Sequence, residues 1–146
     1  MTKKPDDILA PMKKHILVPS LLALGMALCV FAQTEADYQG WMKDIAATAK
    51  KGRDAVQSKS GADAAAAGQH LEMIYKQVGA FFAKRGGADD AVQIARKGET
   101  AAHDLAAAGT ANDADKMAAS MQTINGTCGG CHMAHREGAA GAYKIK

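Results

Sequence analysis

The stretch AAAAGQHLEMIYKQVGAF, residues 64–81, reveals the pattern of the chain, because its apolar side chains recur every three or four residues. The recurring positions are Ala64, Ala67, Leu71, Ile74, Val78 and Phe81. This spacing keeps one stripe of side chains on one face of an α-helix, whereas a strand would alternate. The stretch therefore predicts an amphipathic helix, and its many Ala and Gly residues leave the buried face short of side-chain volume.

Three other segments repeat this spacing, which predicts four amphipathic helices. The first has Tyr38, Met42, Ile45, Ala49, Gly52 and Val56. The third has Ala91, Ile94, Gly98, Ala101, Leu105 and Ala108. The fourth has Ala114, Met117, Met121, Ile124, Cys128, Cys131 and His135. Almost no strand signal follows residue 33, so we expect an all-α protein without a sheet.

Turn and capping residues divide the helices. Turns are predicted at Ser58–Gly61, at Gly86–Gly87 and at Gly109–Thr110. The helix starts that can be capped are Thr34 with Asp37, Ser60 with Asp63, and Asn112 or Asp113. Helices joined by such short turns favour an antiparallel up-down-up-down four-helix bundle. In this arrangement we expect the two chain termini at opposite edges of one end of the bundle.

The N-terminal segment has the pattern of a secretory signal peptide. A polar region with four lysines precedes an apolar run from Ile16 to Ala32, and Val30-Phe31-Ala32 ends in a small residue. A membrane anchor is the alternative, but a run of about 17 residues containing Pro19 is short for a spanning helix. We therefore predict that residues 1–32 are removed on export to the periplasm and that residues 33–146 form one domain. Translation starts at Met1 or at Met12.

The charge and cysteine content of the predicted mature chain narrow the function classes. From Gln33 onward, 14 Lys and Arg face 13 Asp and Glu, a net charge of +1. A near-neutral chain without a basic stripe does not indicate nucleic-acid binding. Cys29 leaves with the signal peptide, so Cys128 and Cys131 are the remaining pair. A single pair of cysteines three residues apart does not make a disulfide framework. We also expect no membrane-spanning segment after the signal peptide is cleaved.

The strongest chemical signal is Cys128-Gly129-Gly130-Cys131-His132, the spacing used to attach a c-type haem. Positions three apart on a helix share a face, so two thiols can bond to the two vinyl groups of one porphyrin. The imidazole of the next residue can then bind the iron. The motif predicts one covalent haem c, with His132 as the proximal ligand.

Two other interpretations use the same residues. A redox dithiol would require a βαβ context, which the helical pattern does not supply. A zinc site could use Cys128, Cys131, His132 and His135, but a tetrahedral site usually draws its ligands from separated segments. Haem attachment explains the spacing better than either. A zinc site and a disulfide between Cys128 and Cys131 remain the alternatives.

Aromatic residues gather at the end of the predicted bundle that carries this motif. The start of the first helix and the end of the second meet the end of the fourth there, which brings Trp41, Phe81 and Phe82 near the cysteines. We predict these three as pocket residues for the haem, although aromatic side chains also serve as ordinary core. Arg136 is predicted to pair with a haem propionate.

A haem motif near the C-terminus of a four-helix bundle resembles the cytochrome c′ family, the class II c-type cytochromes. The likeness extends from about Asp37 to Arg136 and is strongest in CGGCHMAHR, residues 128–136, where Arg136 follows the haem histidine by four. The chain departs from the family at His135, where an aromatic residue is expected, and in the C-terminal YKIK, residues 143–146.

The resemblance makes the sixth iron position decisive for function. Trp41-Met42-Lys43 is similar to the stretch of the low-spin members whose helix-one methionine binds iron, which predicts Met42 as sixth ligand and an electron carrier between unidentified redox partners. The alternative is a five-coordinate cytochrome c′ that binds NO or CO, with Met42 as distal packing. Met73, Met117 and Met121 are predicted to be core residues too far down the bundle. The sequence offers no distal His/Arg pair of the kind that would indicate a haem enzyme. The resemblance leaves open whether the protein forms a homodimer.

Overall fold

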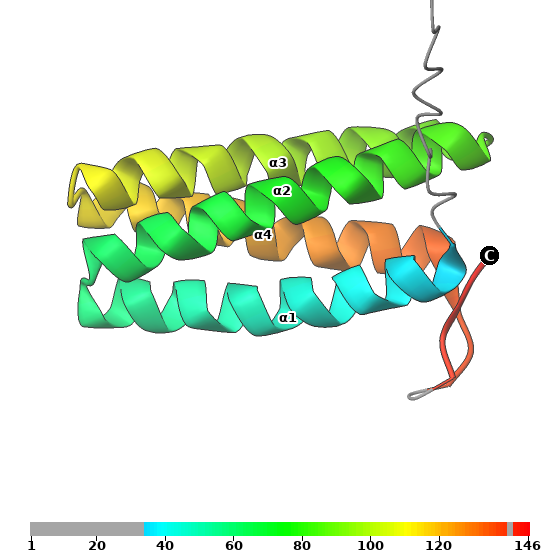
Figure 1. Ribbon diagram of the computed structural model, residues 1–146, viewed down its shortest axis with the longest axis horizontal. Helices are drawn as coiled ribbons and strands as arrows, with labels where there is room; N and C mark the ends of the chain where they lie inside the picture. Colours follow the sequence, from blue (N-terminus) through cyan, green and yellow to red (C-terminus); the bar gives the residue numbers. More distant parts are fainter. Residues whose placement is uncertain (1–33, 140–141) are drawn as a thin grey trace, which may run out of the picture. The chain divides into compact units, whose positions relative to one another are not determined.

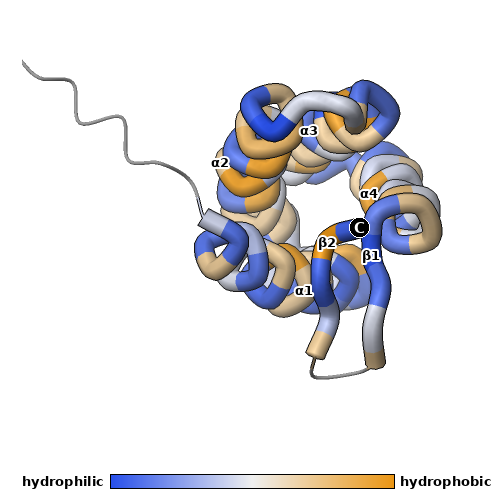
Figure 2. The backbone as a smooth tube through the Cα atoms, turned by 90° about the vertical axis from the view of Figure 1, so that its right-hand side faces the viewer, coloured by the Kyte–Doolittle hydropathy of each residue, from blue (hydrophilic) through white to orange (hydrophobic). Residues whose placement is uncertain are grey.

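The computed structural model of the protein describes residues 34–139 and 142–146. The predicted signal peptide, residues 1–32, lies outside them. The helices are α1 (Glu35–Ser58), α2 (Gly61–Arg85), α3 (Asp89–Thr110) and α4 (Ala114–His135), followed by the strands β1 (Arg136–Glu137) and β2 (Lys144–Ile145). Consecutive helices run antiparallel and follow one another around a ring (Figures 1 and 2). The predicted all-α four-helix bundle is confirmed.

Helix starts follow the predicted capping chemistry. Thr34 and Asp37 form a capping box, in which the Asp37 N–H donates to Thr34 Oγ1 and Asp37 Oδ2 accepts from the Thr34 N–H. Ser60 caps α2 and Asp113 caps α4, each accepting from a backbone N–H three residues later. Such caps satisfy N–H groups that have no partner inside the helix.

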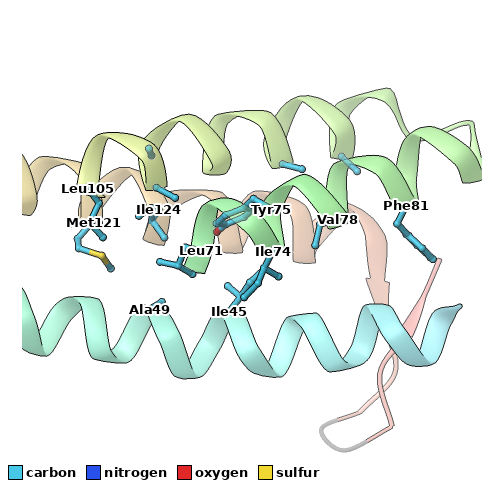
Figure 3. Close-up of a cluster of buried hydrophobic side chains, with 14 of the residues drawn as sticks. Ile45, Ala49, Leu71, Ile74, Tyr75, Val78, Phe81, Leu105, Met121 and Ile124 are labelled. Atoms are coloured by element: carbon cyan, nitrogen blue, oxygen red, sulfur yellow. The ribbon is translucent and has the colours of Figure 1, made fainter. Parts of the chain in front are cut away.

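The core contains the predicted stripes. All six stripe residues of α2 are buried, and Leu71, Leu105 and Ile124 are completely enclosed. Side chains from α1 and α2, among them Ile45, Ile74 and Val78, point into the space between the helices (Figure 3). Met117 and Met121 are core residues as predicted. The prediction for Met73 is wrong, because its side chain is 57% exposed, on the outer face of α2.

Glycines let α2 and α3 approach more closely than any other helix pair. A Cβ on Gly68 would lie 2.5 Å from the Ala106 nitrogen, so only glycine fits there. Gly109 packs against α2 in the same way, which corrects its assignment as a turn residue: α3 continues to Thr110, and Asn112 makes the turn at φ +52°. By contrast α1 and α4 make the fewest contacts of the four neighbouring pairs.

The C-terminal residues contradict the prediction that the mature chain has no sheet. β1 and β2 pair antiparallel, with Arg136 opposite Ile145 and Glu137 opposite Lys144. Two-residue strands are too short to produce a detectable alternation in the sequence. The pair also brings Ile145 beside Glu35, so the last strand lies next to the start of α1 rather than at an opposite edge. The reason is that α4 and α1 are neighbours in the closed ring (Figure 2).

Candidate haem site

The candidate site begins with three residues on the last two turns of α4. Cys128, Cys131 and His132 are each half-buried, and both cysteines are free thiols. Their spacing of three and four residues aligns them on one face of the helix, as the sequence predicts. The Cys128 thiol contacts the Ile124 carbonyl oxygen at 3.7 Å, within the same helix.

A cavity of about 360 Å³ lies against these three side chains and is also lined by Met42 from α1. Its other walls are mostly apolar, and the apolar side chains come from α1, α2 and α3: Ile45, Ala46, Ala49, Val78, Ala91, Ile94 and Ala95. The alanines explain the space, because their short side chains on α1 and α3 leave the middle of the bundle unfilled. The volume falls within the range of small-molecule and cofactor pockets.

The donor set of the cavity fits a haem. Two thiols and an imidazole come from one helix, a thioether comes from another, and most of the remaining lining is apolar. An apolar macrocycle with a central metal requires such a lining, since sulfur and nitrogen ligands bind iron while alkyl groups contact the ring. A larger hollow of about 510 Å³ between α1 and α2 lacks these features, because it has a polar rim and contains no cysteine.

Two polar pairs lie in the wall of the cavity. The Tyr75 hydroxyl is 2.9 Å from Thr127 Oγ1, and both side chains are buried. Arg53 Nη1 donates to Asn125 Oδ1 at 3.1 Å and links α1 to α4. Burial raises the Tyr75 pKa to about 12, so this phenol stays protonated and neutral.

Burial also sets the protonation of the motif residues. It lowers the pKa of His132, and the nearby positive charge of Arg136 lowers that pKa further, so the imidazole is neutral at pH 7 with a free nitrogen lone pair. Burial raises the pKa of the Cys131 thiol, and the negative charge of Asp90 raises that pKa further. The cavity thus presents a neutral imidazole and a protonated thiol.

A second cavity, of about 390 Å³, adjoins the first at the end of the bundle. Both are lined by Met42, Ala46 and His132, so these three residues separate them. Arg136 lines the second cavity, with its guanidinium 4.0 Å above the ring of Tyr143. The structure therefore brings Arg136 near His132, and its pairing with a haem propionate stays a prediction.

The predicted aromatic pocket residues lie elsewhere. Phe81, Phe82 and Trp41 line neither cavity, and instead form a cluster with Tyr38 at the motif-bearing end of the bundle. Phe82 is 1% exposed, so it is ordinary core. The seam spacing determines a face of the helix but not the level of the cavity, and the role of these three as haem-pocket residues stays a prediction.

In the described part of the chain, the histidines outside the motif pair with carboxylates. His135 Nε2 lies 2.8 Å from Asp90, at the start of α3, and its ring packs against Phe82. His70 pairs with Asp44 and His103 with Glu72, each between neighbouring helices. Across residues 34–139 and 142–146 no three His, Cys, Asp or Glu side chains gather as a metal site. His135 therefore faces Asp90 and not a shared site with the cysteines.

Sequence reasoning missed several cavity residues. Tyr75 and Arg53 lie off the predicted stripes, and Ile94, although on its stripe, was not assigned to a pocket. Gly98 offers a signal for Tyr75, because a Cβ there would lie 2.5 Å from the Tyr75 ring. A glycine in the middle of a helix pattern often marks such a close approach.

Comparison with other proteins adds no further assignment. Within the part of the chain that the structure describes, none of the helices is long and apolar enough to cross a bilayer. No protein-family model, curated protein or solved structure matches the chain.

Proposed function

We propose that the protein is a monohaem c-type cytochrome that carries electrons. One observation supports this above the others: a single apolar cavity is lined by Cys128, Cys131 and His132 from α4 and by Met42 from α1. The resemblance to the cytochrome c′ family supports the same conclusion from the motif alone. Together they favour a haem over a zinc ion or a dithiol.

The chain's residues divide the work of holding the group. Cys128 and Cys131 would form the thioether bonds, and His132 and Met42 would be the iron ligands. The haem, when bound, exchanges one electron between ferric and ferrous iron. The wall around the group is mostly apolar. A thioether ligand favours the reduced state more than a second histidine would.

Rigid placement of the ligands suits an electron carrier. α1 and α4 are capped helices within a packed bundle, so ligands held by both undergo little rearrangement when the charge of the site changes. The proposed setting is the periplasm, after removal of residues 1–32, with redox proteins as partners. We propose no enzymatic activity.

The first test is covalent attachment. The full chain, produced in an exporting bacterium with haem-attachment machinery, should retain haem in acidified organic solvent, and denaturing mass spectrometry should find one haem on a chain that begins near Gln33. Cys128→Ser or Cys131→Ser should weaken retention, and the double variant should abolish it. A colourless protein that binds zinc stoichiometrically would reject the proposal.

The second test separates the electron carrier from its alternative, a five-coordinate cytochrome that binds NO or CO. A carrier with Met42 bound should be low-spin when ferric and show the near-infrared band of sulfur ligation. A wild-type protein that is high-spin at neutral pH would make gas binding the better proposal and Met42 a distal packing residue.

A further inference from the structure

A short pair of strands closes the chain beyond α4. We define the clasp as Arg136–Glu137 together with Tyr143–Lys146. Arg136 stands opposite Ile145 and Glu137 opposite Lys144. Gly138 follows β1 at φ +92°, and a Cβ there would lie 2.6 Å from the Ala142 carbonyl oxygen, so the return of the chain requires glycine.

One side of the clasp holds the first turns of α1. Ile145 is 9% exposed and belongs to the same apolar core as Tyr38. Its backbone N–H donates to Glu35 Oε1 at 3.2 Å, and Gln39 Nε2 donates to the Tyr143 carbonyl oxygen at 3.4 Å. Both α1 contacts lie within two turns of Met42.

The other side of the clasp holds the end of α4. The Lys146 N–H donates to the His135 carbonyl oxygen at 3.1 Å, and Lys146 Nζ donates to the Met133 carbonyl oxygen at 3.1 Å. The Arg136 guanidinium lies over the Tyr143 ring. The clasp therefore connects the helix that carries Met42 to the helix that carries His132.

The clasp lies beside the pair of helices that pack least extensively against each other. α1 and α4 are the neighbouring helices with the fewest mutual contacts, and Figure 2 shows the strands beside both of them. The second cavity lies between the clasp and α1, and it reaches Met42 and His132. Further along the same face, Arg53 and Asn125 bridge the two helices.

We propose that the clasp determines how readily a small ligand reaches the iron position between Met42 and His132. By holding the first turns of α1 against α4, it keeps Met42 facing the cavity and covers the approach from the end of the bundle. This inference rests on the proposed haem function, and it makes Ile145 and Glu35 positioning residues for Met42. Without the clasp, the same chain would favour gas binding over electron transfer.

The test compares three variants of the full, haem-loaded chain. Ile145→Ala removes the apolar anchor, whereas Glu35→Gln is the conservative control, because its amide oxygen still accepts the Ile145 N–H. Leu105→Val is the control for general destabilisation, since Leu105 is fully buried. It lies well away along the bundle from Phe81, which is at the motif-bearing end where the clasp lies (Figure 3). Two quantities are measured: the rate of carbon monoxide binding to the ferrous protein, and amide hydrogen exchange in residues 35–46.

Ile145→Ala should raise both the carbon monoxide rate and the exchange of residues 35–46 by about tenfold or more, because loss of a buried side chain promotes local opening. Glu35→Gln and Leu105→Val should stay within about twofold of the wild type in both measurements. An unchanged carbon monoxide rate in Ile145→Ala, or an equal rise in Leu105→Val, would overturn the clasp. A wild-type protein without haem would reject the proposed function instead, and the exchange rates would then decide whether the clasp holds α1.

Discussion

At the scale of single residues, Met42 is the side chain on which the proposed function depends. It comes from the second turn of α1, is half-buried, and lines the cavity that contains Cys128, Cys131 and His132. Its thioether is the one sulfur from another helix in that lining. A methionine in such a place is either an iron ligand or apolar packing.

Met42→Ala should remove the near-infrared sulfur band, convert ferric iron to the high-spin state and lower the reduction potential, because the soft thioether stabilises ferrous iron. Absorption spectra and potentiometric titration measure these changes. Met133→Ala is the matched control, since Met133 follows His132 directly but is 78% exposed. If both variants keep the wild-type spectrum, Met42 is not a ligand.

At the scale of elements, glycine positions show how closely the helices pack. Gly68→Ala should destabilise the bundle by about 1–3 kcal/mol, because the new Cβ would lie 2.5 Å from the Ala106 backbone nitrogen and force α2 and α3 apart. Gly79→Ala, on the same helix, should stabilise it by up to about 1 kcal/mol, since its Cβ would meet Ala95 at an ordinary 3.6 Å. Denaturant unfolding should show that the two variants change the free energy of unfolding in opposite directions. Changes in the same direction would contradict the packing described.

The capping box of α1 makes a second prediction at this scale. Hydrogen bonds from the Thr34 backbone and then from its hydroxyl lower the pKa of Asp37 below 3.8. Because the folded pKa is depressed, the contribution of Asp37 to stability is present above pH 3.8 and is lost as the pH falls through the folded value.

The free energy of unfolding should therefore be measured at several pH values. The values for wild type and Asp37→Asn should differ near neutral pH and converge in acid. Lys144→Gln is a control at the same end of the bundle, and its difference from wild type should not shrink in this pattern. A difference for Asp37→Asn that stays constant down to pH 2 would show that the carboxylate charge adds nothing to the cap.

At the scale of the whole molecule, the cavity predicts that stability depends on the haem. The four helices surround about 360 Å³ that no side chain fills, and α1 and α3 line this cavity with alanine. A ligand that binds the folded state alone stabilises it, and filling an apolar void adds packing contacts. The loaded protein should melt at least about 10 °C above the Cys128→Ser, Cys131→Ser double variant produced without haem.

Calorimetry or circular dichroism on both proteins provides the comparison. The haem-free protein should remain helical, because the capped helices and the tight contact of α2 with α3 do not involve the cavity. Equal melting temperatures would show that the bundle does not need a large apolar group in its core.

Most of the fold could be predicted from the sequence because helical order is local. The stripes at three- and four-residue spacing, the caps at Thr34, Ser60 and Asp113, and the motif at Cys128–His132 all depend on residues within one or two turns. The spacing also identified Met42 as a residue on the inner face of α1. These features require no knowledge of what the helix packs against.

The tertiary structure alone decided which inner-face residues line a cavity. Tyr75 and Arg53 are in its wall, while Phe81, Phe82 and Trp41 are not, because the level and rotation of facing helices depend on contacts between segments distant in sequence. The tertiary structure also decided that Gly109 belongs to α3 and packs against α2, and that Ile145 joins the core beside α1. Strands of two residues are too short to show an alternating pattern in the sequence. The clasp therefore depends on its contacts with α1 and α4, which only the tertiary structure shows.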